Sequence, residues 1–382
     1  MILVTGMAAM TAGCTFQYGL AYLIPALRRE GLSLEQAGLL VACPTVGLLL
    51  TLVAWGAAAD RWGERLVLGA GLSLAGVVLL AGAAAASTAE LGACLALAGA
   101  AGASVYAASG RLILGWFAGH ERGLAMGIRQ SAQPLGVAIA ALVLPSLAGH
   151  GRSAALIFLG AFCLAAAALV ALAVSDPPRP VQQPADRRSP YREPMLWRIH
   201  AASSLLVVPQ FTVATFALVF LVDDRGWHAP EAGRVLAVAA LCGAAARLGA
   251  GYWSDRAGSR MGPMRSLAVA TGLIMLALGA AATSASPLAV AALLAAAVLA
   301  VSTNGLAFTA VAEKAGSSWA GRALGIQNTA QNAFAAATPP LVAAVIGSAG
   351  YPPVFATVAA FPLLAAVLVP VAAERRAGLA GG

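Results

Sequence analysis

The chain has 382 residues, of which 60% are hydrophobic and 10% are charged, and its formal net charge is +8. A soluble globular domain carries about 25% charged residues, so this composition, with a mean hydropathy of +0.84, excludes a set of soluble domains. The positive charge does not indicate nucleic-acid binding, because the basic residues lie in short segments between apolar runs, as the positive-inside rule predicts.

Apolar runs of about 20 residues, the length that spans a bilayer, recur along the whole chain. In chain order we predict spans at residues 2–26, 37–59, 66–86, 91–117, 123–147, 154–174, 196–222, 232–254, 266–284, 288–311, 321–347 and 353–373. Lipid offers no partners to backbone polar groups, so the spans must be α-helices. The sequence therefore predicts an all-α integral membrane protein of twelve transmembrane helices.

The segment 175–195 interrupts this pattern with six prolines among charged residues, which is typical of an extended linker. We predict an N-terminal six-helix bundle at 1–174, a cytoplasmic linker at 175–195 and a C-terminal six-helix bundle at 196–382. With the N-terminus inside, fifteen Lys and Arg residues fall in cytoplasmic loops and five in outer loops. Both termini are therefore predicted to be cytoplasmic.

Lys314 is the only lysine in the chain, and Ala and Gly are abundant. This composition is typical of a GC-rich bacterial genome. We expect a multi-pass protein of the bacterial plasma (inner) membrane, since the first apolar run is too long for a signal peptide. The five cysteines lie in apolar runs without a CxxC pair, and the four histidines are scattered. We therefore expect no metal site and no cofactor.

A short charged turn occurs twice, as GAAADRWGER at 56–65 and as GYWSDRAG at 251–258. In register, Asp60, Arg61 and Gly63 match their second copies at an offset of 195 residues (255 minus 60). A second pair, GIRQSAQ at 127–133 and GIQNTAQ at 325–331, matches at an offset of 198 (325 minus 127). Both copies run in the same direction, which predicts a parallel duplication about an axis along the membrane normal.

The doubled turn resembles the loop between the second and third helices of the major facilitator superfamily, G-x-x-x-D-R-x-G-x-R, whose second copy follows helix 8. The segment ERGLAMGIRQ at 121–130 also looks like the family's helix 4–5 region. The resemblance covers essentially the whole chain, although the N-terminal tail and the usual helix 4 arginine are missing. It implies the major facilitator fold, two pseudo-symmetric six-helix bundles, and transport by rocker-switch alternating access.

The resemblance also implies a gating role for the turn. Asp60 would meet the start of helix 11 near Arg322, and Asp255 the start of helix 5 near Arg122. A helix N-terminus attracts a carboxylate, and such contacts exist only while the cytoplasmic side is closed, so they bias one state. The alternative to a gating role is that Asp60 and Asp255 are ordinary turn aspartates. The predicted gating residues are Asp60, Arg61, Gly63, Arg65, Asp255, Arg256, Arg122 and Arg322.

Three arginines, Arg111, Arg129 and Arg247, lie inside predicted spans. A buried membrane arginine costs roughly 2.5–3.5 kcal/mol on insertion scales and indicates function by default. Arg247 lies about 12 Å and Arg129 about 10 Å from the cytoplasmic ends of their helices, at 1.5 Å per residue. No acidic residue lies within these spans, so the interior favours an anion. The alternative is a structural arginine bonded to backbone carbonyls.

Polar residues recur at matching heights in the two halves. Gln130 and Gln133 mirror Asn328 and Gln331, and Gln17 and Tyr18 are expected opposite Gln210 and Thr212. Such groups either line a pore or join helices, and both readings stay open. The predicted substrate-binding residues are Arg247, Arg129, Gln130, Gln133, Gln17, Tyr18, Gln210, Asn328 and Gln331.

Arg247 matches a helix 8 arginine of the monocarboxylate and oxalate–formate branch, although helix 11 here lacks the basic residue common in that branch. We predict a monomeric secondary transporter in the lipid bilayer that moves a small organic anion, a monocarboxylate, with a coupling proton or counter-ion left open. Efflux of drugs or other neutral or cationic solutes is the alternative, and it predicts an acid inside the membrane. A polytopic enzyme would need a catalytic cluster that the sequence lacks, so no enzymatic activity is expected.

Overall fold

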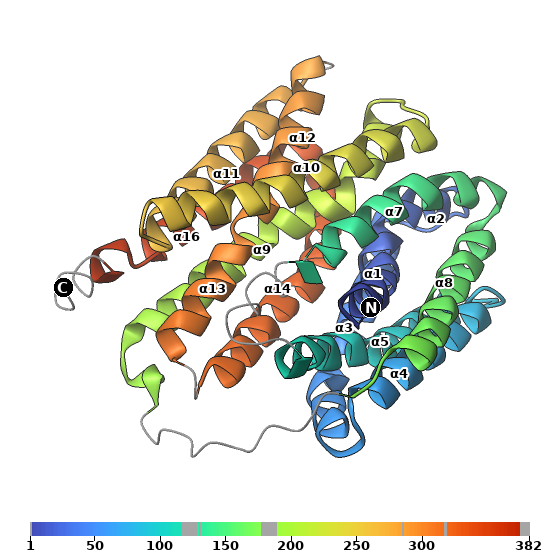
Figure 1. The fold of residues 1–382 in the computed structure, drawn as a ribbon. Helices are drawn as coiled ribbons and strands as arrows, with labels where there is room; N and C mark the ends of the chain where they lie inside the picture. Colours follow the sequence, from blue (N-terminus) through green and yellow to red (C-terminus); the bar gives the residue numbers. More distant parts are fainter. Residues whose placement is uncertain are drawn as a thin grey trace. The chain divides into compact units, whose positions relative to one another are not determined.

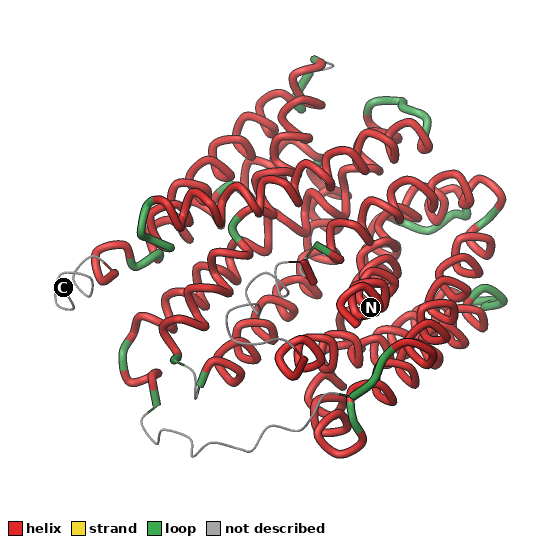
Figure 2. The backbone as a smooth tube through the Cα atoms, in the orientation of Figure 1, coloured by secondary structure: helices red, strands yellow, loops and turns green. Residues whose placement is uncertain are grey.

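A computed structural model describes residues 2–116, 128–129, 131–176, 189–284, 286–316 and 319–374, without the side chains of a few of them, including Asp60 and Arg111. Within these ranges the chain forms helices joined by turns and contains no strand (Figure 2). Eleven helical stretches among the described residues are long and apolar enough to cross a membrane. The first helix, α1 (Ile2–Gly19), is not one of them, although it begins the first predicted span. The all-α membrane fold is thus confirmed.

The chain divides into two compact units. Unit 1 comprises Met1–Gln182 with Leu221–Val238, and unit 2 comprises Gln183–Phe220 with Ala239–Gly382. One division lies inside the predicted linker, and a second stretch, from the end of the seventh predicted span to the start of the eighth, groups with unit 1. Each unit is described by itself below.

Unit 1 is built from long antiparallel helices (Figure 1). After α1 the chain continues through a 3₁₀ turn (Leu20–Leu23) into α2 (Ile24–Arg29), then forms α3 (Leu34–Trp62), α4 (Glu64–Gly82), α5 (Thr88–Trp116), α7 (Ala132–Leu147) and α8 (Arg152–Ala173). Helix α4 packs against both α5 and α8, α3 packs against α5, and α1 packs against α7 and α8. A capping box at Ser33 and Gln36 starts α3 three residues before the predicted span.

Small residues bring α3 and α5 into backbone contact. A Cβ atom added at Gly47 would lie 1.9 Å from the carbonyl oxygen of Ala96, and one at Gly99 would lie 2.0 Å from that of Pro44. Without a hydrophobic drive between helices in lipid, such close approach supplies the van der Waals contact that holds a bundle together. The abundance of glycine and alanine is therefore a requirement of this bundle.

The helices after the linker belong mainly to unit 2, although Leu221–Val238, which includes most of the π-turn and the first part of α10, groups with unit 1. The 3₁₀ turn Pro190–Arg192 leads into α9 (Pro194–Val219), which ends in a π-turn (Phe220–Asp224), and α10 (Ala229–Arg256), α11 (Met261–Ala281), α12 (Pro287–Ser302), α13 (Asn304–Ala315), α14 (Ala320–Ala349), α15 (Tyr351–Val358) and α16 (Ala360–Leu368) follow. Helix α9 packs against α12, α13, α14 and α16. A core that includes Ile199, Leu206, Met264 and Leu306 joins α9, α11 and α13.

Two predicted spans are interrupted in the structure. The span at 288–311 is divided at Thr303 into α12 and α13. The span at 353–373 is divided at Ala359 into α15 and α16, where Pro362 has no N–H to donate back to the carbonyl of Val358. Helix α16 ends two residues before Pro370, because the residue before a proline avoids the helical conformation.

Candidate functional site

A buried arginine, Arg129, contacts two helices of unit 1, α5 and α1. Arg129 is 8% exposed and donates from Nε to Oγ of Ser109 on α5, over 2.9 Å. One terminal NH₂ group points to Sδ of Met10 on α1, at 3.9 Å. Ser109 lies seven residues before the end of α5, which is about 10 Å along the helix. Within the described residues both partners of this guanidinium are neutral.

Three more predicted residues lie in unit 1. Gln17 is buried and donates from Nε2 to Thr45 over 3.1 Å, while its Oε1 atom has no hydrogen-bond partner among the described residues. Tyr18 is hydrogen-bonded to Tyr106, whose hydroxyl also contacts Sγ of Cys14 at 3.5 Å. Gln133 is half-buried on α7. Gln130 lies outside the described residues.

In unit 2 the predicted Arg247 is half-buried on α10 and donates from Nε to the carbonyl oxygen of Val301, over 2.9 Å. Val301 lies two residues before the interruption at Thr303. This contact is of the kind expected for an arginine bonded to a backbone carbonyl.

The predicted amides of unit 2 are joined only in part. Gln210 on α9 accepts a hydrogen bond from Nδ2 of Asn304 on α13, over 2.9 Å. Asn328 accepts from Asn332, one turn later on α14, through its backbone carbonyl at 2.9 Å and its side chain at 3.1 Å. Gln331 is 8% exposed, and its Nε2 atom has no partner among the described residues. One orphaned amide atom is thus present in each unit, on Gln17 and on Gln331.

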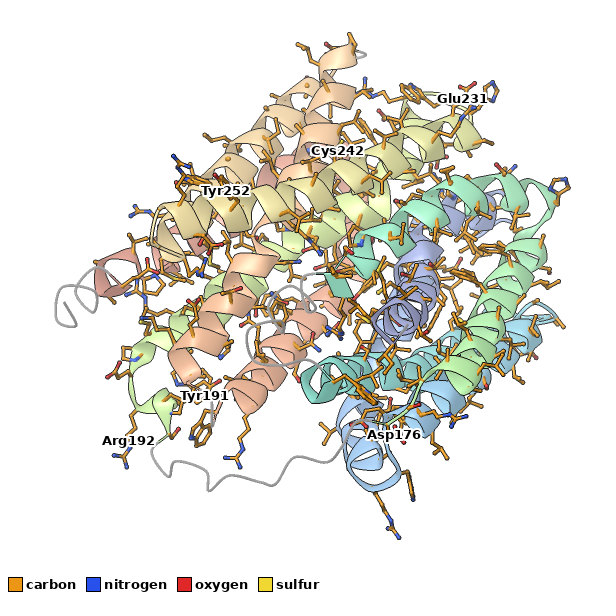
Figure 3. All side chains as sticks on the ribbon, in the orientation of Figure 1. Asp176, Tyr191, Arg192, Glu231, Cys242 and Tyr252 are labelled. Carbon is orange, nitrogen blue, oxygen red and sulfur yellow. The ribbon has the colours of Figure 1, made fainter. Side chains whose placement is uncertain are left out.

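The ends of the units that carry Gly63 and Gly258 are called the motif ends. In unit 1, Gly63 has φ +89°, and a Cβ atom there would lie 2.4 Å from the carboxylate of Asp176. That carboxylate accepts from the backbone N–H of Arg65 over 2.7 Å and so caps the start of α4 (Figure 3). The Arg65 side chain donates to the carbonyl of Ala171 over 2.5 Å. Glycine is therefore required at 63 by both its backbone angle and the carboxylate beside it.

The remaining first-copy residues are placed less completely. The guanidinium of Arg61 lies over the Trp62 ring, 5.6 Å from its centre. Asp60 is in the last turn of α3, but its side chain is outside the described part of the chain, as is all of Arg122. The contacts predicted for Asp60 and Asp255 across the two halves remain predictions.

The second copy forms a charged network around Arg260. This guanidinium pairs with Asp255 and, over 2.9 Å, with Glu313 at the end of α13. Its hydrogen bonds to Glu313, and then to Asp255, raise the pKa of Arg260. Arg256 donates to the Tyr252 hydroxyl over 3.2 Å. On α14, Arg322 is exposed and lies 4.9 Å from the ring centre of Trp319.

Helix α11 is capped by Glu374, just beyond α16. Its carboxylate accepts from the backbone N–H of Arg260 over 2.8 Å, from that of Met261 over 3.2 Å, and from the Ser259 hydroxyl. Arg260 stands 195 residues after Arg65 (260 minus 65), so the same position of each repeat begins a capped helix.

Sequence reasoning missed three of these residues, Asp176, Arg260 and Glu374. A signal existed for each. Arg260 completes the second G-x-x-x-D-R-x-G-x-R, and the two capping acids stand 198 residues apart (374 minus 176), which is the second repeat offset. Buried His200, which bonds Gln327 and Tyr191, was also missed.

The comparisons with known proteins agree with this architecture. A family model described as Major Facilitator Superfamily matches residues 2–339. An uncharacterized MFS-type transporter of Mycobacterium tuberculosis (strain ATCC 25618 / H37Rv) is 44% identical over 375 residues, which cover 97% of this chain and 84% of the relative.

Two solved structures share the fold. A bacterial homolog to the human lysosomal transporter Spinster, in an inward-facing and occupied conformation, matches with a TM-score of 0.82 at 16% identity, over 96% of this chain and 95% of that chain. A D-xylose–proton symporter matches with a TM-score of 0.77 at 15% identity, over 96% of both chains. At these identities the structures show the fold alone. The family model and the Mycobacterium relative, by contrast, show that the chain belongs to the major facilitator superfamily of multi-pass membrane transporters.

Proposed function

We propose that this transporter is a secondary carrier of a small organic anion, a monocarboxylate, and works by alternating access in the bacterial plasma membrane. Its termini face the cytoplasm in this proposal, because basic residues concentrate in the loops on that side. The observation that carries the proposal is the buried guanidinium of Arg129, whose partners within the described residues are neutral.

A buried cation is costly unless an opposite charge compensates it. Ser109 and Met10 supply a hydroxyl and a thioether, which orient the guanidinium without neutralising it. A guanidinium carries five N–H donors in a planar fork, and this fork matches a carboxylate through two parallel hydrogen bonds. A monocarboxylate is therefore the kind of solute that would compensate Arg129.

Arg247 remains the second candidate. It was predicted as the main substrate anchor, but its Nε donates to the carbonyl of Val301. Both arginines use Nε in a hydrogen bond to the protein, but Arg129 is 8% exposed whereas Arg247 is only half-buried, so the charge of Arg129 has the greater need of compensation. We therefore rank Arg129 ahead of Arg247 for holding the charge of the solute, and assign Arg247 to the position of α10 against α12.

The test is uptake into proteoliposomes. Labelled formate, acetate, lactate, pyruvate and oxalate would be compared with a neutral sugar and a cationic dye. Arg129→Lys keeps the charge but loses the bidentate fork, so we expect at least about a tenfold loss of affinity, since 1.4 kcal/mol is a factor of ten. Arg129→Gln should abolish uptake.

Arg265→Gln is the matched control, because Arg265 is exposed at the first turn of α11. Each variant would first be checked for a monodisperse peak in size-exclusion chromatography. Transport of the dye but of no carboxylate would reject the anion proposal in favour of the efflux alternative. Normal carboxylate uptake by Arg129→Gln would remove Arg129 from the site.

A further inference from the structure

His200 is a buried imidazole with a partner at each ring nitrogen. It lies on α9, six residues after Pro194 at the motif end of unit 2, and is 4% exposed. Nδ1 is hydrogen-bonded to Oε1 of Gln327 on α14, and Nε2 is 2.9 Å from the hydroxyl of Tyr191 on the preceding turn. The ring thus connects the end of the predicted linker to two transmembrane helices.

The neighbouring hydrogen bonds fix the tautomer of this imidazole. The Ser203 hydroxyl donates to the backbone carbonyl of His200 over 3.0 Å, so its oxygen is left to accept. Gln327 donates to that oxygen from Nε2 over 2.7 Å, which turns its amide oxygen toward the ring. An amide oxygen only accepts, so Nδ1 must carry a hydrogen. In the neutral ring Nε2 is therefore the acceptor for the Tyr191 hydroxyl.

Protonation of this ring requires one small rearrangement. A hydronium ion gives a proton to the oxygen of Tyr191 as the original hydroxyl proton passes to the lone pair of Nε2. Two O–H bonds break, one in the hydronium ion and one in Tyr191, while one O–H bond and one N–H bond form. The hydronium ion is left as water, the positive charge lies on the imidazolium, and the tyrosine ends as a neutral hydroxyl that accepts from it. Tyr191 is half-buried on the turn before α9, so part of its side chain is exposed to water (Figure 3). Partial burial raises the pKa of Tyr191, so the hydroxyl is protonated at neutral pH.

Two aromatic rings lie beside the imidazole of His200, and one of them is placed to stabilise a positive charge on it. The Tyr191 ring stacks at 5.8 Å between centres, and the Trp197 ring meets it edge-on at 6.4 Å. A ring attracts a cation that lies over its face within about 6 Å, and of these two rings only Tyr191 is stacked within that distance. The Tyr191 ring also lies 5.0 Å from the Trp197 ring and 6.4 Å from the Trp319 ring, measured between centres. A charge on His200 therefore lies beside an aromatic cluster that extends to the start of α14.

Charged groups around the ring lie on the elements that pack against α9. Within the described residues, His200 is hydrogen-bonded to no charged side chain. The charged and titratable groups nearest the motif end on those elements and on α9 itself are Arg192, Glu193, Arg198, Arg265, Glu313, Lys314 and Arg322, while α12 and α16 have none and α15 has Tyr351. Arg198 is bonded to the carbonyl of Leu368, and Glu313 to Arg260. None of these charged groups is hydrogen-bonded to the ring, and both of its hydrogen-bond partners, Tyr191 and Gln327, are uncharged.

We propose that His200 is a proton-binding site, filled from water through the Tyr191 hydroxyl, by which a proton is coupled to transport. The added charge strengthens the contact with Tyr191 and thereby holds the linker end, residues 189–192, more firmly on α9 and α14. The coupling rests on the proposed transport function, whereas the binding of the proton does not.

The proton site is tested without any substrate, by NMR of protein labelled with [¹³Cε1]histidine in lipid nanodiscs. His200→Gln assigns the signal among those of the four histidines. We expect the chemical shift of this signal to change reversibly with pH, because the ring changes its charge when it binds a proton. Tyr191→Phe should lower the proton affinity about tenfold, because a hydrogen bond from the charged ring is roughly twice as strong as the neutral bond that is also lost. Gln327→Glu should raise the affinity, because a carboxylate favours the imidazolium.

Tyr252→Phe is the matched control, since Tyr252 is exposed on α10 and its hydroxyl accepts from Arg256 instead. A His200 signal that does not move with pH, or a midpoint that Tyr191→Phe and Tyr252→Phe change equally, would overturn the proton site. Tyr191 is half-buried at the edge of the core, and Tyr191→Phe keeps the ring that packs there, so this comparison holds even if His200→Gln fails to fold.

Coupling is tested in proteoliposomes with the carboxylate that gives the highest uptake. An inward proton gradient should stimulate uptake by the wild type and not by His200→Gln, while exchange at equal pH persists in both. Full stimulation in His200→Gln would overturn the coupling. A titrating His200 in a protein that moves no carboxylate would support the proton site and reject the anion proposal alone.

Discussion

The cap on α11 gives the sharpest stability prediction. The Glu374 carboxylate accepts two backbone N–H groups at the start of this helix, at 2.8 Å from Arg260 and 3.2 Å from Met261, and also the Ser259 hydroxyl. These N–H groups have no partners within the helix, and the helix dipole favours a negative charge there. Glu374→Gln keeps the shape of the cap but removes its charge, so it isolates the electrostatic part.

The magnitude follows from the type of bond that is changed. A charge-assisted hydrogen bond is roughly twice as strong as a neutral one, and a neutral one contributes about 1 kcal/mol net. Glu374 is half-buried, so solvent screening reduces the effect, and we expect about 1 kcal/mol less stability. Unfolding by SDS in mixed micelles, followed by near-UV circular dichroism, would measure it.

Glu193→Gln is the control for this prediction. Glu193 is the N-cap residue of α9, is exposed, and makes no side-chain cap bond. We expect almost no change in stability for Glu193→Gln, and a loss for Asp176→Asn at the start of α4 similar to that for Glu374→Gln. Equal effects of Glu193→Gln and Glu374→Gln would refute it, because charge near a helix start would then matter without contact.

Three further predictions concern gating, helix contact and topology. Asp60→Asn should express but favour conformations open to the cytoplasm and transport more slowly, and an unchanged distance between spin labels at the motif ends of α3 and α14 would contradict it. Gly47→Ala places a Cβ atom 1.9 Å from a backbone oxygen of α5 and should cost about 1–3 kcal/mol in the SDS assay. Gly249→Ala, with no atom within 4 Å, should cost nothing, and equal losses would argue against the close contact. Cysteines at Ser189 and Ser286 in a cysteine-free background should label from opposite sides of the membrane, and same-side labelling would reject the six-plus-six topology.

The helices were predictable because their signals are local. Apolar runs mark the spans, and the glycines at 63 and 258 mark the two motif turns. The structure gives these glycines positive φ angles of +89° and +59°. The division at Thr303 was not predictable, since the segment 288–311 is apolar on both sides of it. Nothing in that composition distinguishes one long helix from two short ones.

The site was predictable only as a set of residue types. Arg129 stood out because an arginine in a span is rare, but Ser109 lies 20 and Met10 119 residues away, and no spacing rule connects them. His200 was dismissed as scattered for the same reason, because its partner Gln327 is 127 residues distant. Tertiary contacts of this range are set by helix packing, which a single sequence does not encode in any periodicity.

The internal repeat separates scaffold from chemistry in this chain. Residues that shape the backbone are duplicated, as in the capped helix starts at Arg65 and Arg260. Residues with unusual chemistry are not, since Arg129 corresponds to Gln327 at the offset of 198. A group present in one copy only is not required by the repeated backbone, and it serves either a structural role of its own unit, as Arg247 does through its hydrogen bond to Val301, or the proposed function.

The proposed carrier uses two of the ionisable groups that the repeat does not duplicate, one in each unit. At the one repeat position, unit 1 places a permanent cation, Arg129, between neutral partners, and unit 2 places an amide, Gln327, that holds the titratable ring of His200. At the other offset, Arg247 corresponds to Leu52 and His200 to Thr5. A carrier that binds a carboxylate in one half and a proton in the other needs this asymmetry, because a symmetric pair of arginines would offer the proton no site. The double variant Arg129→Gln/Gln327→Arg exchanges the two side chains between the units. It should therefore fold but lose both carboxylate binding and proton binding.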